Sequence, residues 1–254
     1  MKTVTLATQK GGCGKTSVSH ALGFGLASRG FRVLLCDLDP QCSLCDACQI
    51  DTEGTTETLY SVFKGTIPVR KAIQAVSTSG IDLLKGDLLF SRADAEFTQI
   101  GRERMLQKAL KPLQSEYDFC ICDTAPALGI MLANALTASD YVIIPCTPGR
   151  FSIKGIKQLG RFIDEIEEDR NPSLTISGIL INRYTERYTA NRLLLEEIET
   201  AAEALGTTVF DIKIRQSVAV DESQIMQTDI YSGKSPIARD FDNFVSEFLE
   251  RIGK

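Results

Sequence analysis

The run KGGCGKTS at residues 10–17 constrains the fold of this chain more than any other feature. An apolar run, TVTLAT at residues 3–8, precedes it, and residues 15–29 follow with the small and apolar side chains of a packed helix. A glycine-rich loop in this position binds phosphate through its backbone N–H groups, and the helix that follows adds the positive end of its dipole. The sequence therefore predicts a strand, an anion-binding loop and a helix, in that order.

The residues of this run suit a nucleoside triphosphate with Mg²⁺. Gly11, Gly12 and Gly14 let the backbone approach phosphate oxygens closely. Lys15 would reach the β- and γ-phosphates, and the hydroxyl of Thr16 would be a ligand of Mg²⁺. The run fits the pattern G-x-x-x-x-G-K-[ST] only loosely, because its first glycine is absent. The alternative is a glycine turn with an exposed lysine, which the strand before it and the helix after it disfavour.

Further apolar runs alternate with helical patterns along the rest of the chain. Expected strands cover residues 32–39, 81–87, 119–123, 141–146 and 174–182, and expected helices cover residues 55–63, 88–114, 129–138, 152–169, 186–204 and 235–252. Near-continuous apolar runs are typical of parallel strands buried on both faces, so the alternation predicts a doubly wound, mainly parallel α/β sheet. Residues 42–115 contain few strand signals and are expected to form a mainly helical excursion. No linker interrupts the pattern, so residues 1–254 are expected to form one domain.

Three aspartates stand at the ends of expected strands. Asp37 and Asp39 end the run LLCDLD, and Asp123 ends the run FCICD. In an open parallel sheet, ligands bind at the carboxyl ends of the strands, and Mg²⁺ prefers oxygen ligands. A single aspartate in such a place is commonly a helix N-cap. Three of them beside a phosphate-binding loop favour a site for Mg²⁺ and a nucleotide.

Composition and charge disfavour several other classes of protein. The net charge is −5 and the isoelectric point is about 5.1, so contact with nucleic acid would have to come from a local basic patch. No apolar run is long enough to cross a bilayer, and the first residues do not have the pattern of a signal peptide. The eight cysteines are therefore expected as reduced thiols in the cytoplasm. His20 is the single histidine, which disfavours histidine-based catalysis or zinc binding.

Five segments, in this order, resemble the ParA family of partition ATPases, whose phosphate-binding loop is a deviant Walker A motif. They are KGGCGKTS, DLDPQCSL, YDFCICDTAPALGIMLANAL, ASDYVIIP and IRQSVAVDESQ. The resemblance covers nearly the whole chain, and the DPQ triplet is typical of ParA-like rather than MinD-like members. It implies ATP and Mg²⁺ as cofactors. No DNA-binding extension precedes the loop, so the resemblance is to the small type of ParA protein.

The resemblance also implies roles for single residues. Lys10 would be the signature lysine that reaches the partner's nucleotide across an ATP-sandwiched homodimer, and Asp39 would position the attacking water. The implied catalytic residues are Lys10, Lys15 and Asp39; the implied nucleotide-binding residues are Lys10, Gly11, Gly12, Cys13, Gly14, Lys15, Thr16, Ser17, Asn182 and Arg215; and the implied metal-site residues are Thr16, Asp37 and Asp123. Asn182 and Arg215 would contact the adenine. The pattern is broken by Cys13, where a small aliphatic residue is usual, and by Ile214, where proline is common.

The function implied by the resemblance is an ATP-dependent dimerising switch with weak, Mg²⁺-dependent ATPase activity in plasmid or chromosome partition. Such hydrolysis needs positioning and charge neutralisation more than a strong base, and a ParB-like partner would accelerate it. One alternative is a related ATPase that positions a protein complex or a membrane site. A second is a metal- or redox-linked protein that carries the same loop.

ParA-like dimers commonly bind DNA without sequence preference. The basic candidates here are Arg183, Arg187, Arg192, Lys213, Arg215 and Lys234, and the alternative is that these charges lie on solvated helices and loops. The C-terminal run DFDNFVSEFLERIGK is amphipathic, but its acidic residues favour a packing helix over a membrane-binding one. No membrane partner is expected.

Cys42, Cys45 and Cys48 follow the DPQ triplet at a spacing of three residues. They could bind zinc or an iron–sulfur cluster, act as a redox sensor, or pack as small apolar residues. A spacing of three puts all of them on one face of a helix, which suits ligands and packing equally. A fourth cysteine ligand is absent nearby, and other cysteines of the chain stand in apolar strands, which favours packing.

Overall fold

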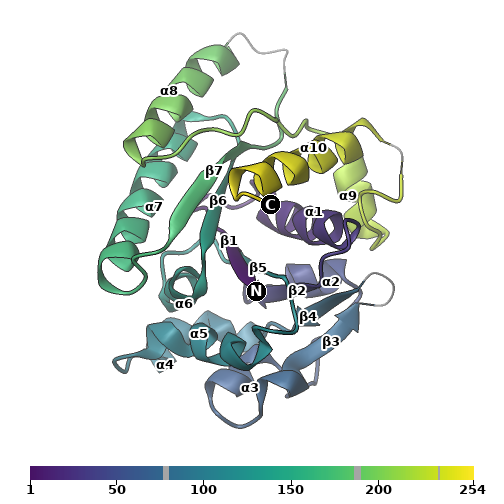
Figure 1. The fold of residues 1–254 in the computed structure, drawn as a ribbon, viewed down its shortest axis with the longest axis vertical. Helices are drawn as coiled ribbons and strands as arrows, with labels where there is room; N and C mark the ends of the chain where they lie inside the picture. The colour runs from purple at the N-terminus through teal and green to yellow at the C-terminus, as the bar shows by residue number, and fades with distance from the viewer. Residues whose placement is uncertain (77–79, 186–189, 234) are drawn as a thin grey trace.

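A seven-stranded β-sheet runs through the centre of the structure, a computed structural model that describes residues 1–76, 80–185, 190–233 and 235–254 (Figure 1). The strands are β1 (Lys2–Leu6), β2 (Val33–Leu38), β3 (Ile73–Val76), β4 (Ile81–Leu84), β5 (Phe119–Thr124), β6 (Tyr141–Cys146) and β7 (Thr175–Ile181). Their order in the sheet is β3-β4-β2-β5-β1-β6-β7, and each neighbouring pair is parallel except β3 with β4. The predicted doubly wound, mainly parallel sheet is confirmed.

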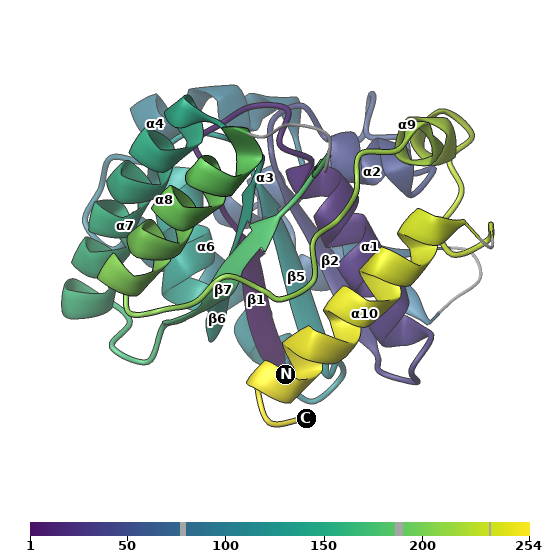
Figure 2. The same ribbon diagram turned by 90° about the horizontal axis from the view of Figure 1, so that it is seen from above.

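Helices cover both faces of this sheet (Figure 2). They are α1 (Lys15–Ala27), α2 (Ser43–Ala47), α3 (Leu59–Phe63), α4 (Ala93–Glu96), α5 (Met105–Leu110), α6 (Ile130–Ala138), α7 (Arg150–Asp169), α8 (Ala190–Ala204), α9 (Val218–Ile225) and α10 (Pro236–Arg251). Short 3₁₀ turns occur at Val69–Ala72, Leu88–Arg92, Arg102–Arg104 and Lys111–Leu113. Helices α1 and α10 lie on one face, and α6, α7 and α8 lie on the other. In the described part of the chain, no helix is long and apolar enough to cross a membrane.

The central strands supply side chains to both apolar layers. In β2, Val33 and Leu35 pack with α1 and α10, whereas Leu34 and Cys36 pack with α3 and α5 on the opposite face. Every residue of β2 and of β5 is buried. This burial on both faces explains why these strands are near-continuous apolar runs in the sequence.

Residues 42–115 differ from the predicted helical excursion. The edge strand β3 was not predicted, because its pattern of half-buried, exposed and buried residues gives a weak apolar signal. The prediction of one helix over residues 88–114 was wrong, since only α4, α5 and short 3₁₀ turns form there. Gly101 interrupts the segment with a φ of 87°, a left-handed conformation that ends helical structure.

Other helices also differ from the prediction in their limits. The helix predicted over residues 55–63 is only α3, because Thr58 is extended and its hydroxyl donates to Asp87 at 2.6 Å. Helix α9 was not predicted. Of the helix predicted over residues 186–204, the described part is α8, and residues 186–189 lie outside the described residues.

Candidate nucleotide-binding site

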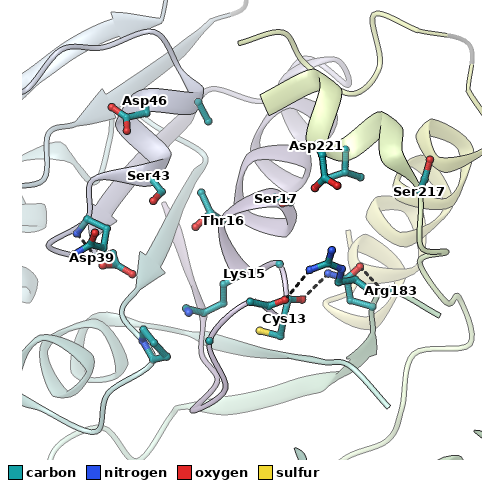
Figure 3. Close-up of a pocket in the computed structure, with 18 of the residues that line it drawn as sticks. Cys13, Lys15, Thr16, Ser17, Asp39, Ser43, Asp46, Arg183, Ser217 and Asp221 are labelled. Atoms are coloured by element: carbon teal, nitrogen blue, oxygen red, sulfur yellow. Dashed lines mark hydrogen bonds between the residues drawn. The ribbon is translucent and has the colours of Figure 1, made fainter. Parts of the chain in front are cut away.

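A cavity of about 550 Å³ lies at the carboxyl edge of the sheet (Figure 3). Its walls are the loop of residues 11–17, the segment that begins α2, the end of β7, and helices α9 and α10. The strands β1, β2, β5 and β7 are parallel neighbours or near neighbours, so their carboxyl ends bring these segments to one place. The volume is in the range of about 300–1,000 Å³ that is typical of small-molecule sites.

The loop between β1 and α1 needs glycine at two positions. Gly12 and Gly14 have φ angles of 72° and 81°, in the left-handed region that favours glycine. A Cβ at Gly14 would also lie 2.5 Å from Nδ2 of Asn182, at the end of β7. That same Nδ2 donates to the carbonyl of Cys13 at 2.7 Å, so β7 holds the loop in its curved form. A backbone curved in this way can present its N–H groups to a phosphate chain.

Two of the three side chains predicted for the Mg²⁺ site, Thr16 and Asp123, meet at the start of α1. The Thr16 hydroxyl donates to Asp123 at 2.7 Å, and the Ser19 hydroxyl lies 3.0 Å from the other oxygen of that carboxylate. Burial raises the pKa of Asp123 to about 6, against the charge of Lys15 and the hydrogen bonds from Thr16 and Ser19. A hydroxyl and a carboxylate beside a phosphate-binding loop are the hard oxygen ligands that Mg²⁺ prefers, so these residues fit the ion.

Asp37 lies behind the cavity wall and is fully buried. One of its oxygens accepts from the backbone N–H of Asp39 at 3.1 Å, and the other accepts from Leu44 and Cys45 at 3.0 Å each. Burial and the nearby charge of Asp123 raise its pKa well above the usual range, and the backbone N–H groups oppose this rise. In this conformation Asp37 anchors the start of α2 and the segment that carries Asp39.

The two other residues predicted for catalysis lie in different places. Asp39 lines the cavity, and one of its oxygens accepts from the backbone N–H of Gln41 at 2.9 Å. Lys10 is not among the lining residues; its Nζ lies 3.8 Å from where a Cβ of Gly149 would be, before α7. Its role toward a second protomer stays a prediction.

Asn182 and Arg215, which the resemblance assigned to the adenine, both line the cavity. Asn182 is only 4% exposed, and its amide is engaged with the loop. Arg215 donates to both carboxylate oxygens of Asp240 in α10, at 2.6 and 2.8 Å. Arg215 therefore ties its part of the cavity wall to α10, and its contact with adenine stays a prediction.

Among the residues that the structure describes, the basic candidates for DNA contact divide between the cavity and the surface outside it. Arg183 lines the cavity, and its Nη1 donates to the carbonyl of Gly12 at 3.0 Å. Lys213 is exposed, with its Nζ 5.2 Å from the ring centre of Tyr184. Arg187 and Lys234 lie outside the described residues, as does the side chain of Arg192. Sequence reasoning missed Arg183 as a cavity residue, although its position directly after Asn182 was a signal for it.

Asp221 is a second cavity residue that the sequence did not indicate. It lies in α9, and its carboxylate points into the cavity (Figure 3). The helix itself was not predicted, and the signal that the sequence did offer was that Asp221 lies in the family segment IRQSVAVDESQ, which begins beside Arg215.

The three thiols after the DPQ triplet pack into the core. Cys42, Cys45 and Cys48 are 6%, 0% and 7% exposed and belong to the apolar cluster that contains Leu44 and Ile50. Cys42 precedes α2 with a φ of 51°, so only the later two follow the helical register. Burial raises the pKa of Cys48 to about 12. Within the described ranges, no group of three or more histidine, cysteine or acidic side chains is arranged to hold a metal ion.

The fold and the loop between β1 and α1, with aspartates at the ends of β2 and β5, define a P-loop nucleoside triphosphatase. A family model described as an AAA domain matches residues 1–176. The chain is 31% identical over 226 residues to the chromosome partitioning protein ParA of Caulobacter vibrioides, covering 88% of this chain and 84% of that protein. It is also 31% identical over 258 residues to a virulence plasmid ParA family protein of Chlamydia psittaci, covering 99% and 96%. The chain belongs to the ParA/Soj family of P-loop ATPases.

A solved structure with the same fold contains a nucleotide. It is described as cobyrinic acid a,c-diamide synthase from Mycobacterium smegmatis with bound ATP analogue and magnesium. Its TM-score is 0.87 at 28% sequence identity, and the match covers 100% of this chain and 96% of that one. Homologous structures therefore bind adenine nucleotides with Mg²⁺.

Proposed function

We propose that this protein is an ATP-dependent dimerising switch with slow, Mg²⁺-dependent ATPase activity, and that it acts in the partition of plasmid or chromosomal DNA. The observation that carries the proposal is the cavity in which Lys15, Thr16 and Asp39 meet. They come from the phosphate-binding loop, the start of α1 and the segment after β2. The names of the two ParA relatives, together with 31% identity, support the partition role.

In this proposal the chain acts by positioning and by neutralising charge. The N–H groups of residues 11–17 bind the phosphate chain, and the ammonium of Lys15 neutralises it. Thr16 and Asp123 would hold Mg²⁺, which would neutralise phosphate charge when bound. Asp39 holds the attacking water. Lys10 lies outside the cavity of its own protomer, which suits a role in the partner's site on dimerisation.

Two substitutions test the proposal. Lys15→Ala should abolish ATP binding, because a nearly buried cation in the cavity is lost. Asp39→Ala should still bind ATP but lose turnover, so that an ATP-bound dimer accumulates. Calorimetry with ATP, phosphate release, and light scattering after gel filtration measure these outcomes, with Asp51→Ala as an exposed control outside the cavity. Unchanged turnover in Asp39→Ala would contradict the role given to that carboxylate.

A second candidate is the same switch acting on a cargo other than DNA. It is favoured by the positions of the basic residues. Among the described candidates, Arg183 and Arg215 are exposed but line the cavity and donate to Gly12 and Asp240, so Lys213 is the exposed candidate outside the cavity. Co-sedimentation with DNA in the presence of ATP or of ADP decides between the two candidates.

A further inference from the structure

We propose that Arg183, which follows β7, and Asp221, in α9, bind the nucleoside half of the nucleotide in the cavity that both residues line. Arg183 is then a nucleotide-binding residue and not a DNA-binding one. This inference rests on the proposed function, because it takes a nucleoside triphosphate as the ligand. It adds two residues to the site. One of them, Arg183, was expected from the sequence to contact DNA.

The backbone at Arg183 is fixed in an unusual conformation. Its φ is 55°, in the left-handed region that is uncommon for residues other than glycine. The N–H of Arg183 donates to Oδ1 of Asn182 at 2.9 Å, and Nδ2 of Asn182 donates to Cys13 at 2.7 Å. The same amide therefore holds both the phosphate-binding loop and the start of the arginine. Uncommon backbone conformations that their surroundings enforce in this way occur often at ligand sites.

The side chain of Arg183 contacts the phosphate-binding loop. Its Nη1 donates to the carbonyl of Gly12 at 3.0 Å, and the residue lines the cavity together with the loop (Figure 3). A guanidinium group has five N–H donors in a planar fork, so one bond to Gly12 leaves most of its hydrogen-bonding capacity for a ligand. Its flat face can also stack on an aromatic ring.

Helix α9 brings a negative group to the same cavity. Figure 3 shows the carboxylate of Asp221 pointing from α9 into the cavity that Arg183 enters from β7. Among the described residues the two side chains do not form an ion pair with each other, although both line the same cavity. Val220 and Phe241 add apolar surface to this end of it.

This end of the cavity suits a nucleoside. A purine base is apolar on its faces and carries hydrogen-bond donors and acceptors on its edges, and the ribose adds hydroxyl groups. The guanidinium can stack on the base or donate to its ring nitrogens, and the carboxylate can accept from an exocyclic amine or a ribose hydroxyl. The phosphate-binding loop borders this part of the cavity through the contact of Arg183 with Gly12, so the triphosphate of the same molecule would continue along the loop.

Calorimetry with three ligands tests the assignment. Arg183→Ala and Asp221→Ala should each weaken the binding of ATP and of ADP by about tenfold, a typical loss for a hydrogen bond to a charged group. The factor should be the same for ATP and ADP, because both carry the same nucleoside. The binding of inorganic tripolyphosphate, which has no nucleoside, should not change.

Matched controls are available on neighbouring elements. Arg239→Ala removes an exposed arginine of α10, and Glu222→Ala removes the exposed acid next to Asp221; neither residue lines the cavity. Both controls should bind ATP as the unmodified protein does. Arg183→Lys should recover only part of the affinity, because lysine keeps the charge and lacks the planar fork.

Two results would overturn the assignment. An equal loss of tripolyphosphate binding would show that Arg183 only orders the loop, and unchanged ATP and ADP binding would show that neither residue contacts the nucleotide. For Asp221, inosine triphosphate tests the exocyclic amine and 2′,3′-dideoxy-ATP tests the ribose hydroxyls. If Asp221→Ala still weakens both analogues by the full factor, its assigned contact is wrong.

These measurements separate a failure of the assignment of Arg183 and Asp221 from a failure of the proposed function. If the unmodified protein binds neither ATP nor ADP, the proposed function fails. If it binds ATP, and Lys15→Ala abolishes this while Arg183→Ala and Asp221→Ala have no effect, only the assignment of these two residues fails.

Discussion

At the scale of single residues, Gly14 shows how strictly the loop is specified. Its φ of 81° disfavours any residue with a Cβ, and a Cβ would meet the Asn182 amide at 2.5 Å. Gly11 has neither restriction, since a Cβ there would have no neighbouring atom within 4 Å and its φ is not in the left-handed region. Of these two positions, three residues apart, only position 14 therefore requires glycine.

This difference leads to a prediction at the residue scale. Gly14→Ala should lower the free energy of unfolding by about 1–2 kcal/mol, because it forces a strained backbone and displaces Asn182. It should also weaken ATP binding far more than Gly11→Ala, which serves as the matched control. Urea denaturation and calorimetry measure the two effects. Equal losses in both variants would show that the Asn182 contact does not matter for the loop.

At the scale of elements, helix α1 carries the phosphate-binding loop at its start and a buried histidine within its length. His20 is 8% exposed, and its ring stacks on Phe24 with the ring centres 4.1 Å apart. Burial lowers the pKa of His20 from 6.5 to about 4, although the charge of Asp229 acts in the opposite direction. The imidazole is therefore neutral in the folded protein near neutral pH.

This buried imidazole predicts a pH dependence of stability. Between pH 6.5 and about 4 the unfolded chain binds a proton at His20 that the folded chain does not. The free energy of unfolding should therefore fall as the pH decreases through this window, by up to about 3 kcal/mol from this residue. Above pH 6.5 the contribution is complete and constant.

The measurement is urea denaturation at several pH values, compared between the unmodified protein and His20→Gln. Carboxylate titrations are common to both proteins, so the difference between the two curves isolates the histidine. The curves should converge as the pH falls. Parallel curves would show that His20 is protonated equally in both states.

At the scale of the whole molecule, the two proposed functions differ in the cargo that the proposed dimer would bind. A dimer doubles the number of phosphate contacts, so weak basic surfaces can add up to measurable DNA binding. If the protein acts in DNA partition, it should co-sediment with DNA in the presence of ATP and not with ADP. Binding without nucleotide dependence, or none with ATP, would favour the candidate that acts on another cargo.

Among the described basic residues, Lys213 gives the clearest test of DNA binding. Lys213→Ala removes one phosphate contact from each protomer, so the slope of log affinity against log salt should become shallower by about 2. Lys108→Ala, an exposed lysine of α5, is the control. An unchanged slope would exclude Lys213 from the DNA contact, while the nucleotide site would be unaffected by that result.

Much of the site could be predicted because it depends on local sequence. The loop, Thr16, Asp39 and Asp123 each follow closely on a buried strand or end one, and parallel strands end at the same edge of the sheet. Residues 42–115 were harder, because β3 is a half-exposed edge strand and Gly101 divides the helical pattern. The spacing of the three cysteines suited several interpretations, and only their burial placed them in the core.

The sequence by itself determined the parallel α/β sheet, the phosphate-binding loop and the aspartates beside it, since these follow from apolar runs and from residues adjacent along the chain. Only the tertiary structure decided which distant residues complete the site. Asn182 and Arg183 reach Cys13 and Gly12 across separations of 169 and 171 residues, because β7 ends beside the loop that follows β1. Packing of the sheet, and not any local pattern, therefore places Arg183, which was expected as a surface charge, in the wall of the cavity.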